Sequence, residues 1–253
     1  MKKIYLALAL IGMVTGCKKQ NEEAGGIIFT FDDQYIDQWY NFREQFIKYN
    51  IKATFFINRP QLLNQEQIEK LKQLSKDGHE IGCHGLNHLN ALDFKDSLVA
   101  SYYKTEVKPA TEILNGLGFE VNSFAYPYGT STDLIDKDIN SHLPYLRKAT
   151  YNMRDTTIDN YNEIYANVAF HHIVSSMGID RNYNISLENI ETGMKRALKN
   201  NEVLVLHAHR ISTTNEDYSV DPEFLKSIFQ LSKTYNLRSI RFCDLESYFT
   251  SAP

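Results

Sequence analysis

The 253-residue chain lacks the features that are typical of disulfide-rich, repeat and nucleic-acid-binding proteins. There are only three cysteines, too few for a disulfide framework, and no internal repeat or low-complexity tract is visible. No basic stripe stands out either, which disfavours a nucleic-acid partner because phosphate binding requires clustered Lys and Arg. What remains is the profile of a globular protein, with 43% hydrophobic and 23% charged residues.

The start of the chain indicates export. Lys2 and Lys3 precede an apolar stretch, 4–14, that is too short to span a bilayer. The sequence VTGC that follows, at 14–17, resembles a bacterial lipobox, whose cysteine becomes the lipidated first residue of the mature protein. We therefore expect a lipoprotein signal peptide at 1–16, a tether at 17–25 and one domain at 26–253. The alternative is an ordinary secretory signal with an incidental cysteine.

The predicted mature chain is acidic and exported. It carries 25 basic and 31 acidic side chains once the signal peptide is removed. Acyl chains on Cys17 would hold it on a membrane, in the periplasm or at the cell surface, without spanning the bilayer. The two remaining cysteines, Cys83 and Cys243, are interpreted as small buried hydrophobes.

Short apolar runs alternate with helical patterns along most of the domain. Strands are expected at 27–31, 52–57, 79–84, from 123, at 203–207 and at 237–242. Helices are expected at 36–49, between Asn64 and Gly78, at 94–116, after Ser186, and from the Asp221-Pro222 cap to about 235. This alternation predicts a parallel sheet covered by helices, either doubly wound or closed as a barrel. The least periodic region, 130–186, is interpreted as loops with strands at 147–151 and 164–170.

Polar side chains follow several of the predicted strands. Asp32 and Asp33 end the first, His84 ends the third and His207 ends the run VLVLH. Because the carboxyl ends of parallel strands form one face, residues distant in sequence are expected to converge there. Neighbouring aspartates can serve one site only where the backbone leaves strand geometry, since strand side chains alternate between faces.

A second pattern is the pair His84 and His88, four residues apart in HGLNH. If the segment turns helically, both imidazoles lie on one side, one turn apart. Two histidines and a carboxylate leave open positions for water and substrate, as a catalytic divalent metal site requires. The histidine pair alone is weak evidence, but together with the double aspartate it favours a metal site.

Four motifs of the sequence resemble those of a known protein family. TFDD at 30–33, HGLNH at 84–88, FAYPYG at 124–129 and LVLH at 204–207 resemble the ordered motifs of the polysaccharide deacetylases, the NodB-like carbohydrate esterase family 4. The resemblance spans about 26–245. It implies a distorted (β/α) barrel with about seven parallel strands, one divalent ion, most commonly zinc, and hydrolysis of N-acetyl or O-acetyl groups on an extracytoplasmic polysaccharide or oligosaccharide.

The resemblance also implies roles for single residues. It makes Asp32 the general base, Asp33, His84 and His88 the metal ligands, Tyr128 the donor of a backbone N–H to an oxyanion, and His207 the general acid. Binding to a cation would separate the proton affinities of the two aspartates, so that they can differ in role. Substrate contacts are expected from Tyr126, Gln34, His209 and Arg210.

Three positions depart from the family pattern. Gln34 stands where the family usually has Gly, and Ala125 where many members have an Arg that pairs with the base. That Arg is therefore absent, or supplied by another residue such as Arg147 or Arg210. The acidic-aromatic fourth motif has no clear counterpart, which leaves the surroundings of His207 undefined.

Two other functions stay open. A carbohydrate-binding lipoprotein could keep the scaffold without turnover, although the presence of every ligand and acid–base residue favours an enzyme. A hydrolase of small amides or imides would use the same metal site in a closed pocket. His79 is interpreted as structural or solvent-facing, and a metal role is disfavoured for His171 and His172, which lie in the poorly periodic region.

Overall fold

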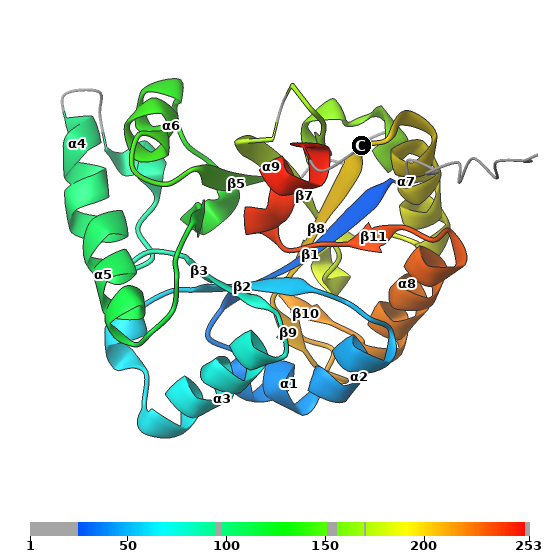
Figure 1. Ribbon diagram of the computed structural model, residues 1–253, viewed down its shortest axis with the longest axis horizontal. Helices are drawn as coiled ribbons and strands as arrows, with labels where there is room; N and C mark the ends of the chain where they lie inside the picture. The colour runs from blue at the N-terminus through cyan, green and yellow to red at the C-terminus, as the bar shows by residue number, and fades with distance from the viewer. Residues whose placement is uncertain (1–24, 95–97, 151–155, 170, 251–253) are drawn as a thin grey trace, which may run out of the picture.

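The structure is a computed structural model that describes residues 25–94, 98–150, 156–169 and 171–250. The predicted signal peptide, and the tether up to residue 24, lie outside the described residues. Seven parallel strands form a closed barrel (Figure 1), because the last of them pairs with the first. They are β1 (Gly26–Asp33), β2 (Ala53–Ile57), β3 (Glu80–Cys83), β4 (Ser123–Ala125), β5 (Tyr145–Thr150), β7 (Ile173–Gly178) and β8 (Val203–Ala208). The predicted (β/α) barrel is confirmed.

Helices surround the barrel (Figure 1). They are α1 (Ile36–Asn41), α2 (Arg43–Lys48), α3 (Gln65–Lys76), α4 (Val99–Tyr102), α5 (Lys108–Gly116), α6 (Asp133–Asn140), α7 (Leu187–Asn200), α8 (Pro222–Thr234) and α9 (Leu245–Thr250). The predicted caps are present: Asn64 and Gln67 form a capping box, and Ser186 and Asp221 accept backbone hydrogen bonds at the starts of α7 and α8. Within the described ranges, no helix is both long and apolar enough to cross a membrane.

Some predicted boundaries were wrong. The helix expected at 36–49 is two helices that meet at Phe42, whose ring packs on Phe46 and Phe229. In the stretch at 94–116, a π-helical segment joins α4 to α5, and residues 95–97 lie outside the described part. The last strand shortens to β11 (Arg238–Ser239), beside β1, because a 3-10 turn follows at Phe242–Asp244.

The region 130–186 holds more structure than its pattern indicated. Neither α6 nor β7 was predicted, since α6 is short and polar and the serines of β7 interrupt its apolar run. The strand expected at 147–151 is β5, with residue 151 outside the described part. Of the strand expected at 164–170, the structure describes only β6 (Tyr165–Ala166), antiparallel to β8. A further short pair joins β9 (Arg210–Ile211) to β10 (Ser219–Val220).

Side-chain alternation separates the core into two clusters. In β1, Ile27, Phe29 and Phe31 belong to the large cluster beneath the helices, whereas Ile28 belongs to the cluster inside the barrel. The interior cluster also contains Leu245 of α9, together with Ile28 and Val203 near the starts of β1 and β8. Helix α9 therefore covers the end of the barrel where the strands begin. The two cysteines in the described ranges, at 83 and 243, are free, and Cys83 is buried.

The same alternation aims the polar residues inward at the other end. In β1 the inward positions continue from Ile28 through Thr30 to Asp32, and in β8 they run from Val203 through Val205 to His207. Thr30 and His207 are register partners, so the polar ends of these strands lie at the same level. Strand periodicity therefore places apolar side chains inside the barrel where the strands begin and polar side chains inside it where the strands end.

Candidate active site

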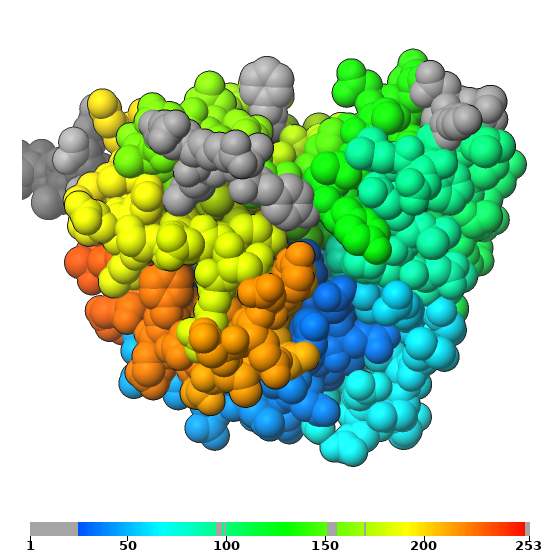
Figure 2. All heavy atoms as spheres, turned by 180° about the vertical axis from the view of Figure 1, so that it is seen from behind, coloured from blue at the N-terminus to red at the C-terminus, as the bar shows by residue number. Residues whose placement is uncertain are grey.

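A pocket of about 360 Å³ opens over these polar side chains. Figure 2 shows that face of the molecule, where N-terminal segments in blue meet later segments in green, yellow and orange. Its lining combines three acidic or basic groups, four histidines and five tyrosines: Asp32, Asp33 and Arg147, His84, His88, His207 and His209, and Tyr35, Tyr126, Tyr128, Tyr183 and Tyr218, with Gly129. Most of the predicted site residues therefore share one cavity.

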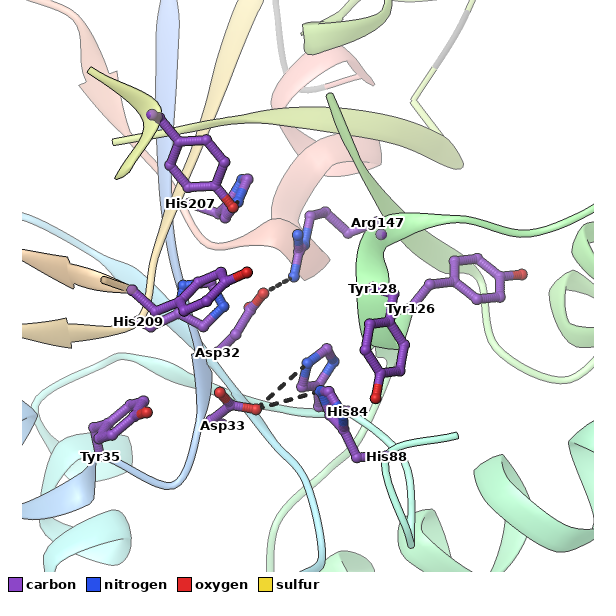
Figure 3. A pocket seen from close by; sticks show the side chains of 13 residues that line it. Asp32, Asp33, Tyr35, His84, His88, Tyr126, Tyr128, Arg147, His207 and His209 are labelled. Atoms are coloured by element: carbon purple, nitrogen blue, oxygen red, sulfur yellow. Dashed lines mark hydrogen bonds and ion pairs between the residues drawn. The ribbon is translucent and has the colours of Figure 1, made fainter. Parts of the chain in front are cut away.

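Asp33, His84 and His88 form a compact set of potential metal ligands (Figure 3). Asp33 Oδ1 lies 3.8 Å from His84 Nε2 and 3.5 Å from His88 Nε2, and one ligand atom from each residue lies within 4.8 Å of the others. Asp33 ends β1 with φ 81°, so the backbone leaves strand geometry there, as the double aspartate required. Asn58 Nδ2 donates to Asp33 Oδ1 at 2.6 Å and fixes the carboxylate.

His84 and His88 are joined by a loop, so the condition of a helical turn is not met. Gly85 and His88 have positive φ, 90° and 63°. Glu106 Oε1 accepts the backbone N–H of Asn87 at 2.6 Å and that of Leu89 at 3.1 Å, so a buried carboxylate holds the loop. The two imidazoles still meet, with ring centroids 5.0 Å apart.

Both histidines of this cluster are neutral and suited to binding a cation. His84 Nδ1 lies 2.8 Å from the carbonyl oxygen of Ala125, which can only accept, so Nδ1 carries the proton and Nε2 keeps its lone pair. Burial lowers the pKa of His84 to about 4 and also lowers the pKa of His88. With one carboxylate and two imidazole nitrogens, the set fits a divalent metal that keeps open positions.

Asp32 points into the barrel and pairs with Arg147 (Figure 3). Arg147 Nη2 donates to Asp32 Oδ2, and both side chains are almost fully buried. Burial alone would raise the pKa of Asp32, but the Arg147 guanidinium and nearby imidazoles bring it well below its usual value. The other oxygen, Oδ1, is buried without a hydrogen-bond partner in the described part of the chain. Asp32 is therefore an ionised carboxylate with one acceptor oxygen unused.

Arg147 fills the place of the arginine missing at Ala125. The two residues are register partners in β4 and β5, so the guanidinium reaches the same level from the next strand. Arg210, the other candidate, pairs instead with Glu216 and stacks over the Tyr35 ring at 4.7 Å. Arg210 does not line the pocket.

The remaining predicted residues are divided between the pocket and its surroundings. Tyr126 lines the pocket from a buried position, while Tyr128 is 55% exposed, has φ 60° and stands 5.0 Å from the His88 ring. Gln34 is not among the lining residues. Its amide donates to the carbonyl oxygens of Asn58 and Arg59. Gln34 therefore stabilises the loop that contains Asn58, the hydrogen-bond donor to Asp33.

Two histidines stand at the end of β8. His207 is buried, with Nδ1 2.9 Å from Ser176 Oγ and Nε2 3.2 Å from the Tyr183 hydroxyl. His209 Nδ1 lies 2.6 Å from Asp180 Oδ2. Sequence reasoning named neither Asp180 nor Ser176. Asp180 was detectable in principle, since it follows β7 as the other polar residues follow their strands, but β7 itself was not predicted.

The chain is similar to several known proteins. The sequence model of a family described as polysaccharide deacetylase matches residues 19–146. A Bacillus subtilis (strain 168) protein whose name includes the words polysaccharide deacetylase is 27% identical over 156 residues, 59% of this chain and 50% of that protein. A chitin deacetylase of Arthroderma benhamiae is 27% identical over 138 residues, 53% of this chain and 34% of its own length. The chain thus matches half or less of the length of these curated relatives.

A solved structure extends the likeness over the barrel. The chitin deacetylase of Colletotrichum lindemuthianum superposes with a TM-score of 0.59 at 14% identity, covering 91% of this chain and 90% of that one. At this identity the likeness shows a shared fold, the NodB-like barrel.

Proposed function

The chain belongs to the polysaccharide deacetylase family, and we propose that it is a metal-dependent hydrolase of N-acetyl or O-acetyl groups on a polysaccharide. One observation carries the proposal. Asp33, His84 and His88 converge on a common point, and the ionised Asp32 stands beside them. A binding protein would have no need for an unused carboxylate oxygen next to a metal site.

The proposed cofactor is one divalent ion, with zinc as the first candidate. Asp33, His84 and His88 would hold it, and their nitrogen and oxygen donors suit zinc. When bound, such an ion polarises an acetyl carbonyl and lowers the pKa of a bound water towards about 7.

The residues around the ligands take the acid–base roles. Asp32 accepts a proton from the attacking water through its unused oxygen, while Arg147 holds the carboxylate in place and keeps it ionised. The backbone N–H of Tyr128 is the proposed donor to the oxyanion, with Tyr126 contributing to the substrate pocket. A histidine at the end of β8 then protonates the leaving group, and His207 is the one that the family resemblance assigns.

The proposed substrate is a polymer outside the cytoplasm. Export and lipid attachment at Cys17 are inferred from the leader sequence, and the membrane is then a partner through acyl chains alone. The exposed Tyr128 and Tyr218 rings at the pocket rim suit contact with sugar rings, since aromatic side chains combine a large apolar face with a polar edge.

Acetate release tests the proposal. Purified protein is stripped of metal, resupplied with zinc, and incubated with chitin oligosaccharides, acetylated xylan and small acetamides. We expect release from a glycan only with metal, and Asp32→Asn should bind zinc but lose turnover. His172→Gln, at an exposed histidine outside the pocket, is the matched control. Glycan binding without acetate release would favour the non-catalytic alternative, and turnover of small amides alone would favour the small-molecule hydrolase.

A further inference from the structure

The two histidines at the end of β8 have different surroundings. His207 lies in β8 and His209 follows directly after that strand, and both line the pocket. In the view of Figure 3, Asp32 lies between them and the His84–His88 pair. Both imidazoles line the same pocket as Asp33, His84 and His88, so each is a candidate for contact with the group that leaves when an acetyl bond breaks. Their hydrogen-bond partners distinguish them.

His207 is held as a neutral acceptor. The single hydroxyl proton of Ser176 is donated to the carbonyl of Lys148 at 3.1 Å, so Ser176 Oγ accepts from Arg147 Nη1 at 3.1 Å and from His207 Nδ1 at 2.9 Å. Nδ1 of His207 thus carries a proton, and Nε2 presents a lone pair towards the Tyr183 hydroxyl at 3.2 Å. No carboxylate is hydrogen-bonded to this imidazole in the described ranges.

His209 is hydrogen-bonded to a buried carboxylate. Its Nδ1 donates to Asp180 Oδ2 at 2.6 Å, and its backbone N–H donates to Asp180 Oδ1 at 3.1 Å. The Asp180 side chain is fully buried, with 0% exposure, so its charge acts through little intervening water. Trp39 Nε1 donates to the carbonyl of His209 at 2.7 Å, which fixes the backbone as well. Nδ1 is committed to Asp180, and Nε2 is the nitrogen left for the pocket.

We propose that His209, oriented and charged by Asp180, is the proton donor to the leaving group, and that the neighbouring His207 is not. The inference rests on the proposed function and deepens it. As the tetrahedral intermediate collapses, the carbonyl re-forms and the C–N or C–O bond breaks with its electron pair going to the leaving atom. The Nε2 proton of His209 passes to that atom, and the products are a free amine or hydroxyl and acetic acid, which loses its proton to solvent and becomes acetate. The proton taken from water by Asp32 later restores the imidazolium.

The charges around each ring agree with this assignment. Burial lowers the pKa of His209, but the hydrogen bond and charge of Asp180, with Asp32 and Asp33, outweigh burial and raise it. The other titratable groups whose rings contact His209 are the His207 imidazole and the Tyr218 phenol. Burial and the Arg147 guanidinium lower the pKa of His207 well below its usual range.

Leaving-group dependence gives the sharpest test. An acetylated glycan amine needs a proton to depart, whereas 4-nitrophenolate departs without one. We expect His209→Gln to lower kcat/KM for the glycan by about 10²- to 10⁴-fold and to lower it for 4-nitrophenyl acetate by less than about tenfold. His172→Gln should change neither, and Asp32→Asn should impair both. Equal losses of His209→Gln on the two substrates, or a selective loss in His207→Gln instead, would overturn the assignment.

A titration separates this inference from the proposed function. The imidazole resonances of His209 and His207 are followed by NMR against pH in wild type and Asp180→Asn. The wild-type pKa of His209 should exceed that of His207 and should fall in Asp180→Asn, and in the active enzyme the alkaline limb of kcat/KM should move down with it. A His209 that titrates below His207 would refute the proposal even in an active enzyme. If no substrate releases acetate, the proposed function fails and its proton donor with it, whatever the titration shows.

Discussion

Arg147→Met should destabilise the protein more than any change at its exposed ion pairs. The guanidinium and the Asp32 carboxylate are 1% and 5% exposed, and the same arginine bonds Ser176 and lies 5.4 Å from the centroid of the Phe56 ring. Removing one partner of a buried pair leaves an uncompensated charge, which typically costs about 3–5 kcal/mol. Urea unfolding of the metal-free protein at pH 7 measures this cost.

A double-mutant cycle isolates the pair. Asp32→Asn alone leaves the Arg147 charge buried without its partner. The double variant Arg147→Met/Asp32→Asn should therefore lose about 2–3 kcal/mol less free energy of unfolding than the sum of the losses in the two single variants. Arg210→Met is the control, because its partner Glu216 is 56% exposed and such pairs contribute about 1 kcal/mol or less. A coupling energy under about 0.5 kcal/mol would show that Arg147 and Asp32 do not act as a pair. It would contradict the conclusion that Arg147 replaces the arginine missing at Ala125.

Three further changes test other parts of the structure. Asn58→Ala removes the donor to Asp33 and should weaken zinc binding about 10- to 100-fold in a chelator competition, whereas unchanged affinity would contradict its orienting role. His79 is buried, accepts a hydrogen bond from the Ala53 N–H and has its pKa lowered by burial to about 4. The free energy of unfolding of the wild type should therefore fall as the pH drops from about 6.5 towards 4, because the unfolded chain binds the proton more readily. In urea unfolding, His79→Gln should show a smaller change of this free energy with pH. Gly178→Ala should cost about 1–3 kcal/mol because its Cβ would collide with the Tyr183 ring, and adding Tyr183→Ala should restore part of that loss.

The sequence predicted β1 and β8, whose inward and outward positions are both apolar along most of their length. In β1 and β8 such runs end in Asp32 and His207, and the closed barrel brings these ends together. In β7 the inward Ser176 interrupts the run, so the strand went unnoticed and Asp180 with it. A polar residue that serves the site thus removed the pattern by which its strand would have been found.

Two features of the site depend on geometry that a sequence does not carry. Arg147 replaces the arginine missing at Ala125 because β4 and β5 pair in one particular register, and a shift by one residue would turn the guanidinium away. The spacing of His84 and His88 would bring the two rings together in a helical turn, but positive φ angles and Glu106 bring them together in a loop. Four-residue spacing is therefore compatible with a shared ion without a helix.

The common direction of the strands has a consequence for how the molecule would sit on a surface. β1 rises about 23 Å from Gly26 to Asp33, so the chain enters the barrel at the end opposite the pocket. Residues 18–25 could span at most about 29 Å when fully extended. An anchor at Cys17, if present, would thus join the barrel at the end opposite the pocket, which leaves the pocket open to polymers beyond the lipid headgroups.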